Sequence, residues 1–597
     1  MWRSRPAVRS LITVWALCAL LFLLRTTQTA KYALTWDVFG YYLYLPATFI
    51  HDDPGLRDRA WLDKVMATYD PSSTLYQLVD GEDGSRVIKY SSGMAVAYAP
   101  WFFVAHAIAE PLGYPADGFS PPYQYLITYG TLLWVVAGLF LLRKVLLHFF
   151  DDRLTALLIA LVVLGTNYLH LAALDGTLLT HPFLFTLYAG LVLATIRWHE
   201  KPSVKAAVTI GALAGWVTLV RPSEGVCLLI PLLWANADGF AAKWRSIKAH
   251  PTHLVFAIAA FAIAVSPQLL YWHSVSGKWL FYSYVNAGEG FDFTTPHISD
   301  YLFSFRKGWF LYTPLMALAV LSLVVLWKHA HHVFLAIALF LMVDLYVVAS
   351  WTNWWYAGGS FSARSMVPAY VLLAIPLGFA LKESASRASL RKFAMFFVGA
   401  LALLNLFQTW QWNHGIISKE RMTGAYYAAV FGRTNVPTDA QHMLLVERPL
   451  TEEEVLTDAR SYSMRVLYEN TFDYRTDSAY TLTPVDPFTP GPDVRFKDLT
   501  TKDHAWLRIS ARIFVTDSTG APPVIVCTFH HKGETYKYKT MTWDLATAAK
   551  STWATLSFDY LTPEVRSQDD NLKVYIWNQH GGTHRVNDLR VEVFEPR

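Results

Sequence analysis

The chain has 597 residues, of which 53% are hydrophobic and 16% are charged, and its formal net charge is +4. So apolar a composition excludes a wholly soluble protein, and so small a net charge leaves no basic patch for nucleic acid. Apolar residues concentrate before residue 412, whereas the remainder has an ordinary soluble composition. We therefore expect one membrane domain and one soluble domain.

Apolar stretches before residue 412 recur at lengths that can cross a bilayer as helices. They are residues 8–29, 124–142, 154–174, 182–197, 205–220, 222–236, 252–273, 309–327, 332–350, 365–381 and 392–410. Residues 205–236 could instead form one broken helix, so the prediction is about eleven spans. Basic residues before the first stretch also fit a cleaved signal peptide, and under either interpretation the chain emerges on the outer side.

The basic residues of the short loops predict the orientation, because Lys and Arg near the ends of spans are retained in the cytoplasm. The N-terminus and the loops near 143–153, 197–205, 243–248, 328 and 382–392 are rich in Lys, Arg or both, and are expected inside. The alternate loops are poor in basic residues. Together with the C-terminal domain, they are expected outside: 30–123, 175–181, 221, 274–308 and 351–364.

The segment 92–111 is apolar enough to cross the membrane, and a span here would put every later loop on the opposite side of the membrane. Pro100, His106 and Glu110 weaken it as a spanning helix. We interpret it as a re-entrant or interfacial helix in the outer leaflet, since inversion would place the basic loops outside.

Four clusters of polar and charged residues lie at the predicted outer ends of the spans. They are 35–46, 175–182, 221–225, and 302–309 together with 354–364. An ionisable group near the centre of a spanning helix costs about 2.5–3.5 kcal/mol on insertion, so its presence needs a reason. Pro222 and Gly225 also predict a helix break at Arg221. We expect one outward cavity lined by Asp37, Tyr41, Tyr42, Asp175, His181, Arg221, Glu224, Arg306, Lys307, Trp354 and Arg364.

Three of these clusters also have a simpler interpretation. Asp37 could be a solvated loop residue, and Trp354 could belong to an interfacial aromatic belt. Arg221 could pair with Glu224, three residues later. The convergence of all four clusters on one predicted side favours the functional interpretation.

Several short motifs occur along residues 1–410, and their order and common predicted side carry a resemblance to a known family. They are Asp37 within DVFGYYLYLPA, Lys89-Tyr90 followed by Gly93, the turn 175–182, Arg221-Pro222 with Gly225, LFS-x-x-KG at 302–308 and GG-x-F-x-x-R at 358–364. With these motifs the chain resembles the GT-C superfamily of integral-membrane glycosyltransferases. The resemblance is to bacterial relatives of protein O-mannosyltransferases and aminoarabinose transferases, similar to glycosyltransferase family 39.

The resemblance implies an enzyme of the bacterial inner (plasma) membrane that uses a polyprenyl-phosphate sugar donor and a glycan, lipid or protein acceptor on the outer face. Asp37 would be the base that takes the proton of the acceptor hydroxyl. Aromatic residues such as Trp36, Tyr41, Tyr42 and Trp354 could stack on the sugar or the prenyl chain. Cations would stabilise the phosphate leaving group, and the candidates are Lys89, Arg221, Arg306, Lys307 and Arg364.

The first acidic motif departs from the family pattern, in which the acidic residue is often doubled. Here Val38 and Phe39 follow Asp37, so a divalent metal is possible but not implied. Cys18, Cys227 and Cys527 are far apart and predict neither a disulfide framework nor a zinc site.

The C-terminal part changes to short alternating apolar and polar runs, which are typical of strands. Such runs occur at 505–510, 524–529, 572–577 and 589–594. They predict an extracytoplasmic β-sandwich at 441–597, after a linker at 413–440 and a membrane domain at 1–412. The last strand is similar to that of a jelly-roll carbohydrate-binding module, and a structural cap on the membrane domain is the alternative.

The predicted fold class is therefore mostly α, a polytopic transmembrane bundle of the GT-C kind followed by a jelly-roll-like β-sandwich. Two other functions remain open. A transporter or flippase of lipid-linked sugars would also break helices and line a cavity with charge, but it should show internal repeats, and none is clear. A non-catalytic scaffold would not need Asp37, Asp175 and Arg221 on one side.

Overall fold

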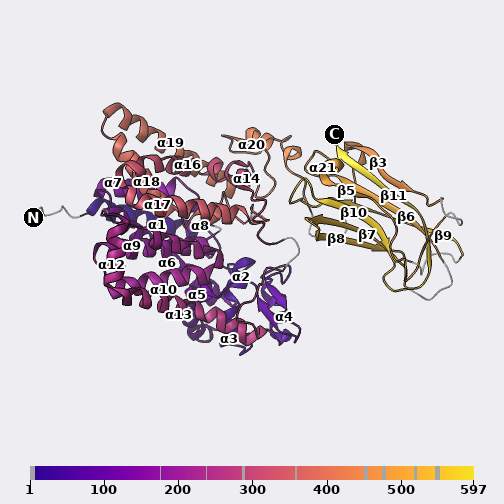
Figure 1. The fold of residues 1–597 in the computed structure, drawn as a ribbon, viewed down its shortest axis with the longest axis horizontal. Coiled ribbons are helices and arrows are strands. Elements are labelled where there is room, and N and C mark those ends of the chain that lie inside the picture. Colours follow the sequence, from indigo (N-terminus) through magenta and orange to yellow (C-terminus); the bar gives the residue numbers. More distant parts are fainter. Residues whose placement is uncertain are drawn as a thin grey trace, which may run out of the picture. The chain divides into compact units, whose positions relative to one another are not determined.

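The computed structural model describes residues 7–174, 176–236, 238–285, 289–355, 359–448, 455–473, 479–515, 521–544 and 551–597. The chain forms two compact units, a helical unit that ends at Gln441 and a β unit of His442–Arg597 (Figure 1). The mostly helical fold class with a C-terminal β domain is confirmed.

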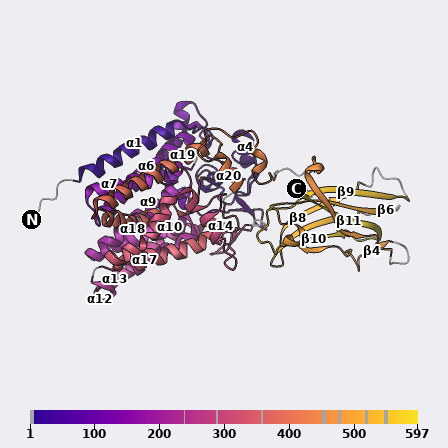
Figure 2. The same cartoon turned by 90° about the horizontal axis from the view of Figure 1, so that it is seen from above.

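In the helical unit, the longer helices lie alongside one another (Figures 1 and 2). They are α1 (Val8–Thr26), α5 (Gly93–Ala109), α6 (Pro121–Leu147), α7 (Asp152–Leu164), α9 (Thr180–Glu200), α10 (Val204–Val220), α12 (Gly239–Ala249), α13 (Pro251–Ser276), α17 (Leu323–Ala349), α18 (Tyr370–Ser384) and α19 (Ala388–Asn413). The shorter elements are α2 (Asp37–Tyr42), α3 (Tyr44–Phe49), α4 (Arg59–Tyr69), β1 (Leu78–Asp80), β2 (Arg86–Ile88), α8 (Tyr168–Ala173), α11 (Leu229–Leu233), α14 (Ile298–Phe303), α15 (Trp309–Tyr312), α16 (Pro314–Leu321) and α20 (Gly424–Val430).

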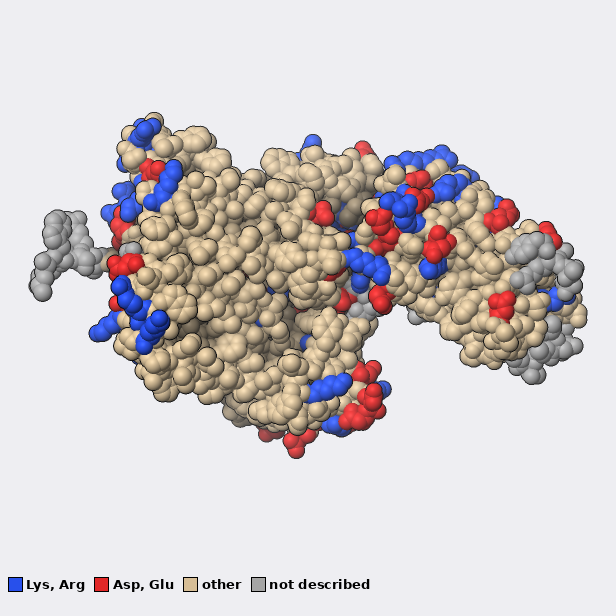
Figure 3. Space-filling view, viewed as in Figure 1, with Lys and Arg blue, Asp and Glu red and all other residues tan. Residues whose placement is uncertain are grey.

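Five of the described helices, α1, α6, α13, α17 and α19, are long and apolar enough to cross a membrane. Only 11% of the most apolar window of α13, and the same share of α19, is buried against protein. Exposed apolar surface of this extent suits lipid rather than water. On the face shown in Figure 3, charged side chains of the helical unit gather near its two ends and leave a broad uncharged band between them.

The helix break predicted at Arg221 is confirmed. Helix α10 ends at Val220, Arg221 adopts an extended backbone conformation, and a 3-10 turn follows over Pro222–Leu228. Proline removes a backbone donor here, so the α-helical hydrogen-bond ladder cannot continue through it. The side chain of Arg221 is thus carried at an interruption of the helix and not on a regular helical face.

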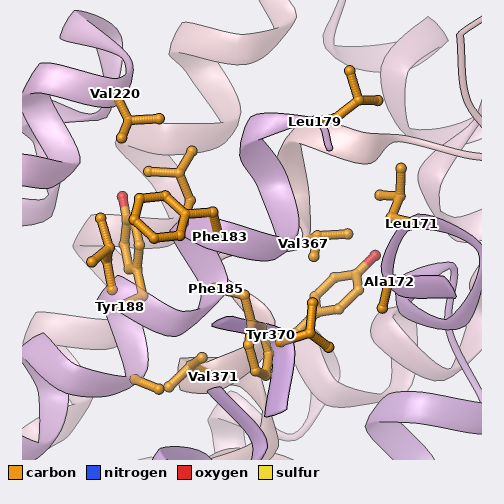
Figure 4. Close-up of a cluster of buried hydrophobic side chains, with 14 of the residues drawn as sticks. Leu171, Ala172, Leu179, Phe183, Phe185, Tyr188, Val220, Val367, Tyr370 and Val371 are labelled. Carbon is orange, nitrogen blue, oxygen red and sulfur yellow. The ribbon is translucent and has the colours of Figure 1, made fainter. Parts of the chain in front are cut away.

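The core of the helical unit centres on α9, which packs against α6, α10 and α18. Nearly every side chain of α9 is buried, as expected of a helix that is apolar all round. Figure 4 shows Phe183, Phe185 and Tyr188 of this helix among buried side chains from α8, α10 and the start of α18. This packing fixes the first turn of α9, where His181 lies.

The predicted linker residues lie within the helical unit, where they contain α20. The side-chain amide of Gln411 donates hydrogen bonds to the carbonyl oxygens of Val430 and Arg433, at 2.9 and 2.8 Å. The hydroxyl of Tyr426 donates to the carbonyl of Ile416 at 3.1 Å. The chain after α19 is therefore folded against that helix.

The β unit contains two antiparallel sheets. One has the strand order β5-β10-β7-β8, and the other has the order β3-β11-β6-β9, with β4 also paired to β11. The elements are β3 (Tyr462–Asn470), β4 (Tyr480–Leu482), β5 (Asp493–Arg495), α21 (Phe496–Leu499), β6 (Trp506–Phe514), β7 (Val524–His531), β8 (Glu534–Thr542), β9 (Trp553–Leu561), β10 (Asn571–Trp577) and β11 (His584–Pro596).

Alternate side chains from the two sheets form one buried cluster, which includes Leu507 and Ile509 of β6 and Leu572 and Val574 of β10. The sheets therefore pack face to face as a sandwich. The four strands predicted from the alternating pattern are confirmed as parts of β6, β7, β10 and β11.

Candidate active site around Asp37

Asp37 is the first residue of α2, and its two carboxylate oxygens have different neighbours. Oδ1 accepts hydrogen bonds from the hydroxyls of Tyr76 and Tyr90, at 2.8 and 2.7 Å. Oδ2 lies 3.4 Å from Nη2 of Arg364. The Asp37 side chain is 26% exposed and that of Arg364 is 11% exposed, so the ion pair is largely buried, but Asp37 remains accessible to a small ligand.

The hairpin of β1 and β2 positions the two tyrosines, because Tyr76 precedes β1 and Tyr90 follows β2. Its end is tied to the start of α2 by the amide of Gln77, which donates to the carbonyl of Trp36 at 3.1 Å. Gly40 of α2 permits the close approach, because a Cβ there would lie 2.6 Å from the ring of Tyr90. Arg364 comes from a different region, the 3-10 turn Arg364–Met366 before α18.

Lys89 is buried beside the two tyrosines. Its ammonium forms a salt bridge with Glu289. It also lies 5.4, 5.7 and 5.1 Å from the ring centres of Tyr76, Tyr90 and Tyr284. These are cation–π distances, so the Lys89 charge is balanced by one carboxylate and three aromatic faces. Lys89 thus borders the tyrosines that hold Asp37.

Tyr41 lies on the same turn of α2 and packs against Tyr90, with ring centres 4.5 Å apart. Burial, and next the charge of Asp37, raises the pKa of Tyr41 above its ordinary value, while the charges of Arg221 and Arg364 oppose the rise. Two arginines that are far apart in sequence therefore act on the same phenol beside Asp37. Its hydroxyl stays protonated at neutral pH.

His181 also belongs to this group. It is 3% exposed and lies within electrostatic range of both Arg221 and Arg364. Its Nδ1 atom is buried and has no hydrogen-bond partner in the described part of the chain. The structure thus brings together five predicted residues, Asp37, Tyr41, His181, Arg221 and Arg364. On the face shown in Figure 3, the helical unit is hollowed near the place where Figure 1 draws α2, and Lys or Arg atoms are visible inside.

Glu224 belongs to a second polar group, deeper among the helices. Its carboxylate accepts a hydrogen bond from the hydroxyl of Tyr188 at 2.6 Å. Asp344 of α17, which is 3% exposed, lies within electrostatic range of both Glu224 and Arg221. We did not predict Asp344, although a lone carboxylate within the apolar run of α17 is a signal that could have found it.

Lys307 is buried near Arg364. Its ammonium donates to the carbonyl of Ser360 and lies 4.2 Å from the ring centre of Trp412. Burial, and next the charge of Arg364, holds the pKa of Lys307 well below its ordinary value. Lys307 therefore supports the loop before Arg364.

Arg306 and Trp354 have contacts of their own. The guanidinium of Arg306 lies 4.1 Å from the ring centre of Trp355, and its Nε donates to the carbonyl of Glu420 at 2.6 Å. Trp354 packs edge-on against Trp355, with ring centres 5.8 Å apart. These contacts join Arg306 and Trp354 to Trp355 and to the segment before α20, and none of them involves Asp37.

Of the two remaining predicted residues, one lies away from the site and the other is not described by the structure. Tyr42 points away from Asp37, because its hydroxyl donates to the carbonyl of Gly118 at 2.5 Å and its ring packs against Phe102 and Phe119. Asp175 lies outside the described residues. Sequence reasoning missed Tyr76, Tyr284 and Glu289, which carry no motif of their own.

The donor set around Asp37 does not suit a divalent cation. The described neighbours of its carboxylate are hydroxyl donors and a guanidinium, and such groups compete with or repel a metal ion. No group of three or more His, Cys, Asp or Glu side chains with metal-binding geometry occurs among the described residues.

No protein-family model matches the chain, and no curated protein matches it. Among solved structures, the chain is similar to the arabinosyltransferase EmbB from Mycobacterium smegmatis, with a TM-score of 0.28 and 11% sequence identity. The alignment covers 84% of this chain and 59% of that chain, so the chain spans less than two thirds of the length of that protein. A similarity of this size fixes neither a shared fold nor a shared activity.

Proposed function

We propose that the chain is a membrane glycosyltransferase of the GT-C kind, which moves a sugar from a polyprenyl-phosphate donor to an extracytoplasmic acceptor. The observation that carries the proposal is the partly exposed carboxylate of Asp37, in which Oδ1 accepts two hydrogen bonds and Oδ2 faces Arg364. The field of Arg221 reaches the same place. A base and two cations at one site are what this reaction requires.

The proposed reaction is one displacement at the anomeric carbon of the donor sugar. The acceptor hydroxyl gives its proton to Asp37 as its oxygen forms the new glycosidic bond. The bond between the anomeric carbon and the phosphate oxygen breaks, and its electron pair stays on the phosphate. The products are the glycosylated acceptor, the polyprenyl phosphate and a protonated Asp37, which returns its proton to water.

Arg364 and Arg221 would stabilise the charge that develops on the leaving phosphate. Guanidinium groups bind phosphate oxygens through paired N–H donors, and a phosphate leaving group needs no general acid. Lys89 is less suited to this role because Glu289 already pairs with it. The acceptor is a glycan, a lipid or a protein on the outer face of the bacterial inner membrane, the side on which the basic residues of the loops predict Asp37 to lie.

Transfer from radiolabelled polyprenyl-phosphate sugars to membrane acceptors, measured with the purified chain in nanodiscs, tests the proposal. Asp37→Asn removes the base and keeps the shape, so transfer should fall by about 10²–10⁴-fold. Asp83→Asn is the control, because Asp83 belongs to the same outer region but pairs with Arg57 on the surface. Full transfer by Asp37→Asn would remove the base assignment.

A flippase of lipid-linked sugars is the second candidate, and the buried group of Glu224, Tyr188 and Asp344 is the observation that favours it. Charged residues inside a membrane bundle commonly line a path for polar cargo. In proteoliposomes, translocation of a labelled lipid-linked sugar without release of the sugar would support this function. Release of the sugar onto an acceptor would support the transferase.

We further propose that the β unit is a jelly roll. With β4 set aside, the strands pair in nested fashion, β3 with β11, β5 with β10, β6 with β9 and β7 with β8, as in one long hairpin that has been rolled up. On the β10 sheet, Phe488 stacks on Trp577 and lies edge-on to Tyr575, with ring centres 5.9 and 5.7 Å apart. Partly exposed rings of this kind can stack on sugars, which supports a role in holding a glycan acceptor.

A further inference from the structure

The two oxygens of Asp37 do different work in the proposed reaction. We infer that Tyr76 and Tyr90 are positioning residues, which fix the carboxylate of Asp37 through Oδ1 and leave Oδ2 as the oxygen that takes the acceptor proton. This inference rests on the proposed function. It adds the location of the acceptor hydroxyl, beside Oδ2 and next to Arg364.

The distances support this division. Two phenol hydroxyls at 2.8 and 2.7 Å from Oδ1 are full hydrogen bonds to a charged acceptor. The guanidinium of Arg364 lies 3.4 Å from Oδ2, beyond the usual range of about 2.7–2.9 Å for a charge-assisted bond. Oδ2 is therefore the less occupied oxygen, and an acceptor hydroxyl can reach it while Arg364 stays close enough to contact the donor phosphate.

The tyrosines are held as rigidly as the carboxylate they bind. The ring of Tyr90 packs on Tyr41, and the rings of Tyr76 and Tyr90 both face the ammonium of Lys89. Burial, and next the charge of Asp37, raises the pKa of both phenols above the ordinary value. Tyr76 and Tyr90 therefore stay protonated and donate to Asp37 across the working pH range, and they do not compete with it as bases.

The two hydrogen bonds to Oδ1 have a measurable consequence for transfer. The loss of one phenol hydroxyl leaves the carboxylate of Asp37 less firmly positioned for the acceptor proton. A single hydrogen bond to a charged group is expected to change the rate by about 10-fold. The value of kcat should therefore fall by about 10-fold in Tyr76→Phe and in Tyr90→Phe, while KM for the donor stays constant.

Infrared spectroscopy of the full chain in nanodiscs detects these hydrogen bonds without any substrate. The carboxylate stretching band of Asp37 is the one that Asp37→Asn removes, and its frequency should shift in each Phe variant, because each variant loses one donor to Oδ1. Tyr69→Phe is the matched control, because the hydroxyl of Tyr69 donates to Asp117 instead. An unchanged band in Tyr76→Phe and Tyr90→Phe, or an equal shift in Tyr69→Phe, would overturn the inference.

The kinetics of transfer separate this inference from the proposed function. If the band shifts and kcat falls in both Phe variants while KM for the donor stays constant, both proposals are supported. If the band shifts but none of the radiolabelled polyprenyl-phosphate sugars is consumed by the unchanged chain, the glycosyltransferase proposal fails and the contact between the tyrosines and Asp37 stands. If transfer occurs with an unchanged kcat in Tyr76→Phe and Tyr90→Phe, the positioning role fails and the transferase stands.

Discussion

Gly93 lies at a close backbone contact in the helical unit, where α5 meets the end of α10. A Cβ at this position would lie 2.4 Å from the backbone nitrogen of Val220 and 2.6 Å from the carbonyl carbon of Leu219. An ordinary contact needs at least 3.4 Å, so α5 and α10 would have to separate by about 1 Å. Backbone atoms cannot rotate away as a side chain can. Arg221 follows this contact directly, and Tyr90 precedes Gly93 by three residues.

We expect Gly93→Ala to reduce both stability and transfer. Forcing one methyl group into a packed contact costs about 1–3 kcal/mol, which should lower the thermal midpoint in nanodiscs. A displacement of about 1 Å between Arg221 and Asp37 should reduce transfer by about 10²-fold, because catalysis depends steeply on position. Both quantities are measurable on one preparation, by tryptophan fluorescence on heating and by radiolabelled transfer.

Two other glycines serve as controls. A Cβ at Gly211 would lie 1.9 Å from the carbonyl oxygen of Ala257, so Gly211→Ala should destabilise the contact of α10 with α13 while affecting transfer less. A Cβ at Gly399 meets nothing within 4 Å, so Gly399→Ala should keep activity and gain up to about 1 kcal/mol of helix propensity. If Gly93→Ala matched Gly399→Ala in both assays, the reasoning would be refuted.

Two further variants test buried charges. Glu289→Gln leaves the Lys89 ammonium, whose side chain is 2% exposed, without its opposite charge. The thermal unfolding midpoint should fall by an amount equivalent to about 3 kcal/mol, and adding Lys89→Met to the same chain should recover part of the loss. Asp570→Asn changes a buried carboxylate of the β unit, which is hydrogen-bonded to the ring Nδ1 of His531 at 2.6 Å and accepts from the Tyr536 hydroxyl at 2.8 Å. The variant should lower the free energy of unfolding of the β unit by about 1–3 kcal/mol. Hydrogen exchange of β7 and β10 measures this loss, and unchanged exchange would contradict it.

Local patterns in the sequence were sufficient for some elements of the fold. The break after Val220 follows from Pro222, and β6 and β10 follow from strict alternation of apolar and polar residues. These features depend on neighbours within a few residues. They are set by backbone chemistry and side-chain period, which a single sequence displays directly.

The contacts of the site depend on residues that are far apart in the chain, so a single sequence does not display them. Asp37 and Arg364 are 327 positions apart, and Lys89 and Glu289 are 200 apart. Sequence reasoning found Asp37 and Arg364 because each is charged and close to a predicted span. It missed Glu289 because a carboxylate is common in a polar outer loop and gives no signal in the sequence. Its importance comes from its pairing with the buried ammonium of Lys89.

Charge balance favours the proposed transfer over simple binding of a lipid-linked sugar. The carboxylate of Asp37 and the guanidiniums of Arg221 and Arg364 all act on Tyr41, while the nearby charge of Lys89 is paired with that of Glu289. Before reaction their sum is positive by one charge, which suits the single negative charge of a phosphate that carries both a sugar and a lipid. Transfer protonates Asp37 and frees the phosphate to carry a second negative charge. The net charge of the three side chains therefore rises by one unit as the charge of the leaving phosphate falls by one. A flippase leaves its cargo intact and gains nothing from a base at this position.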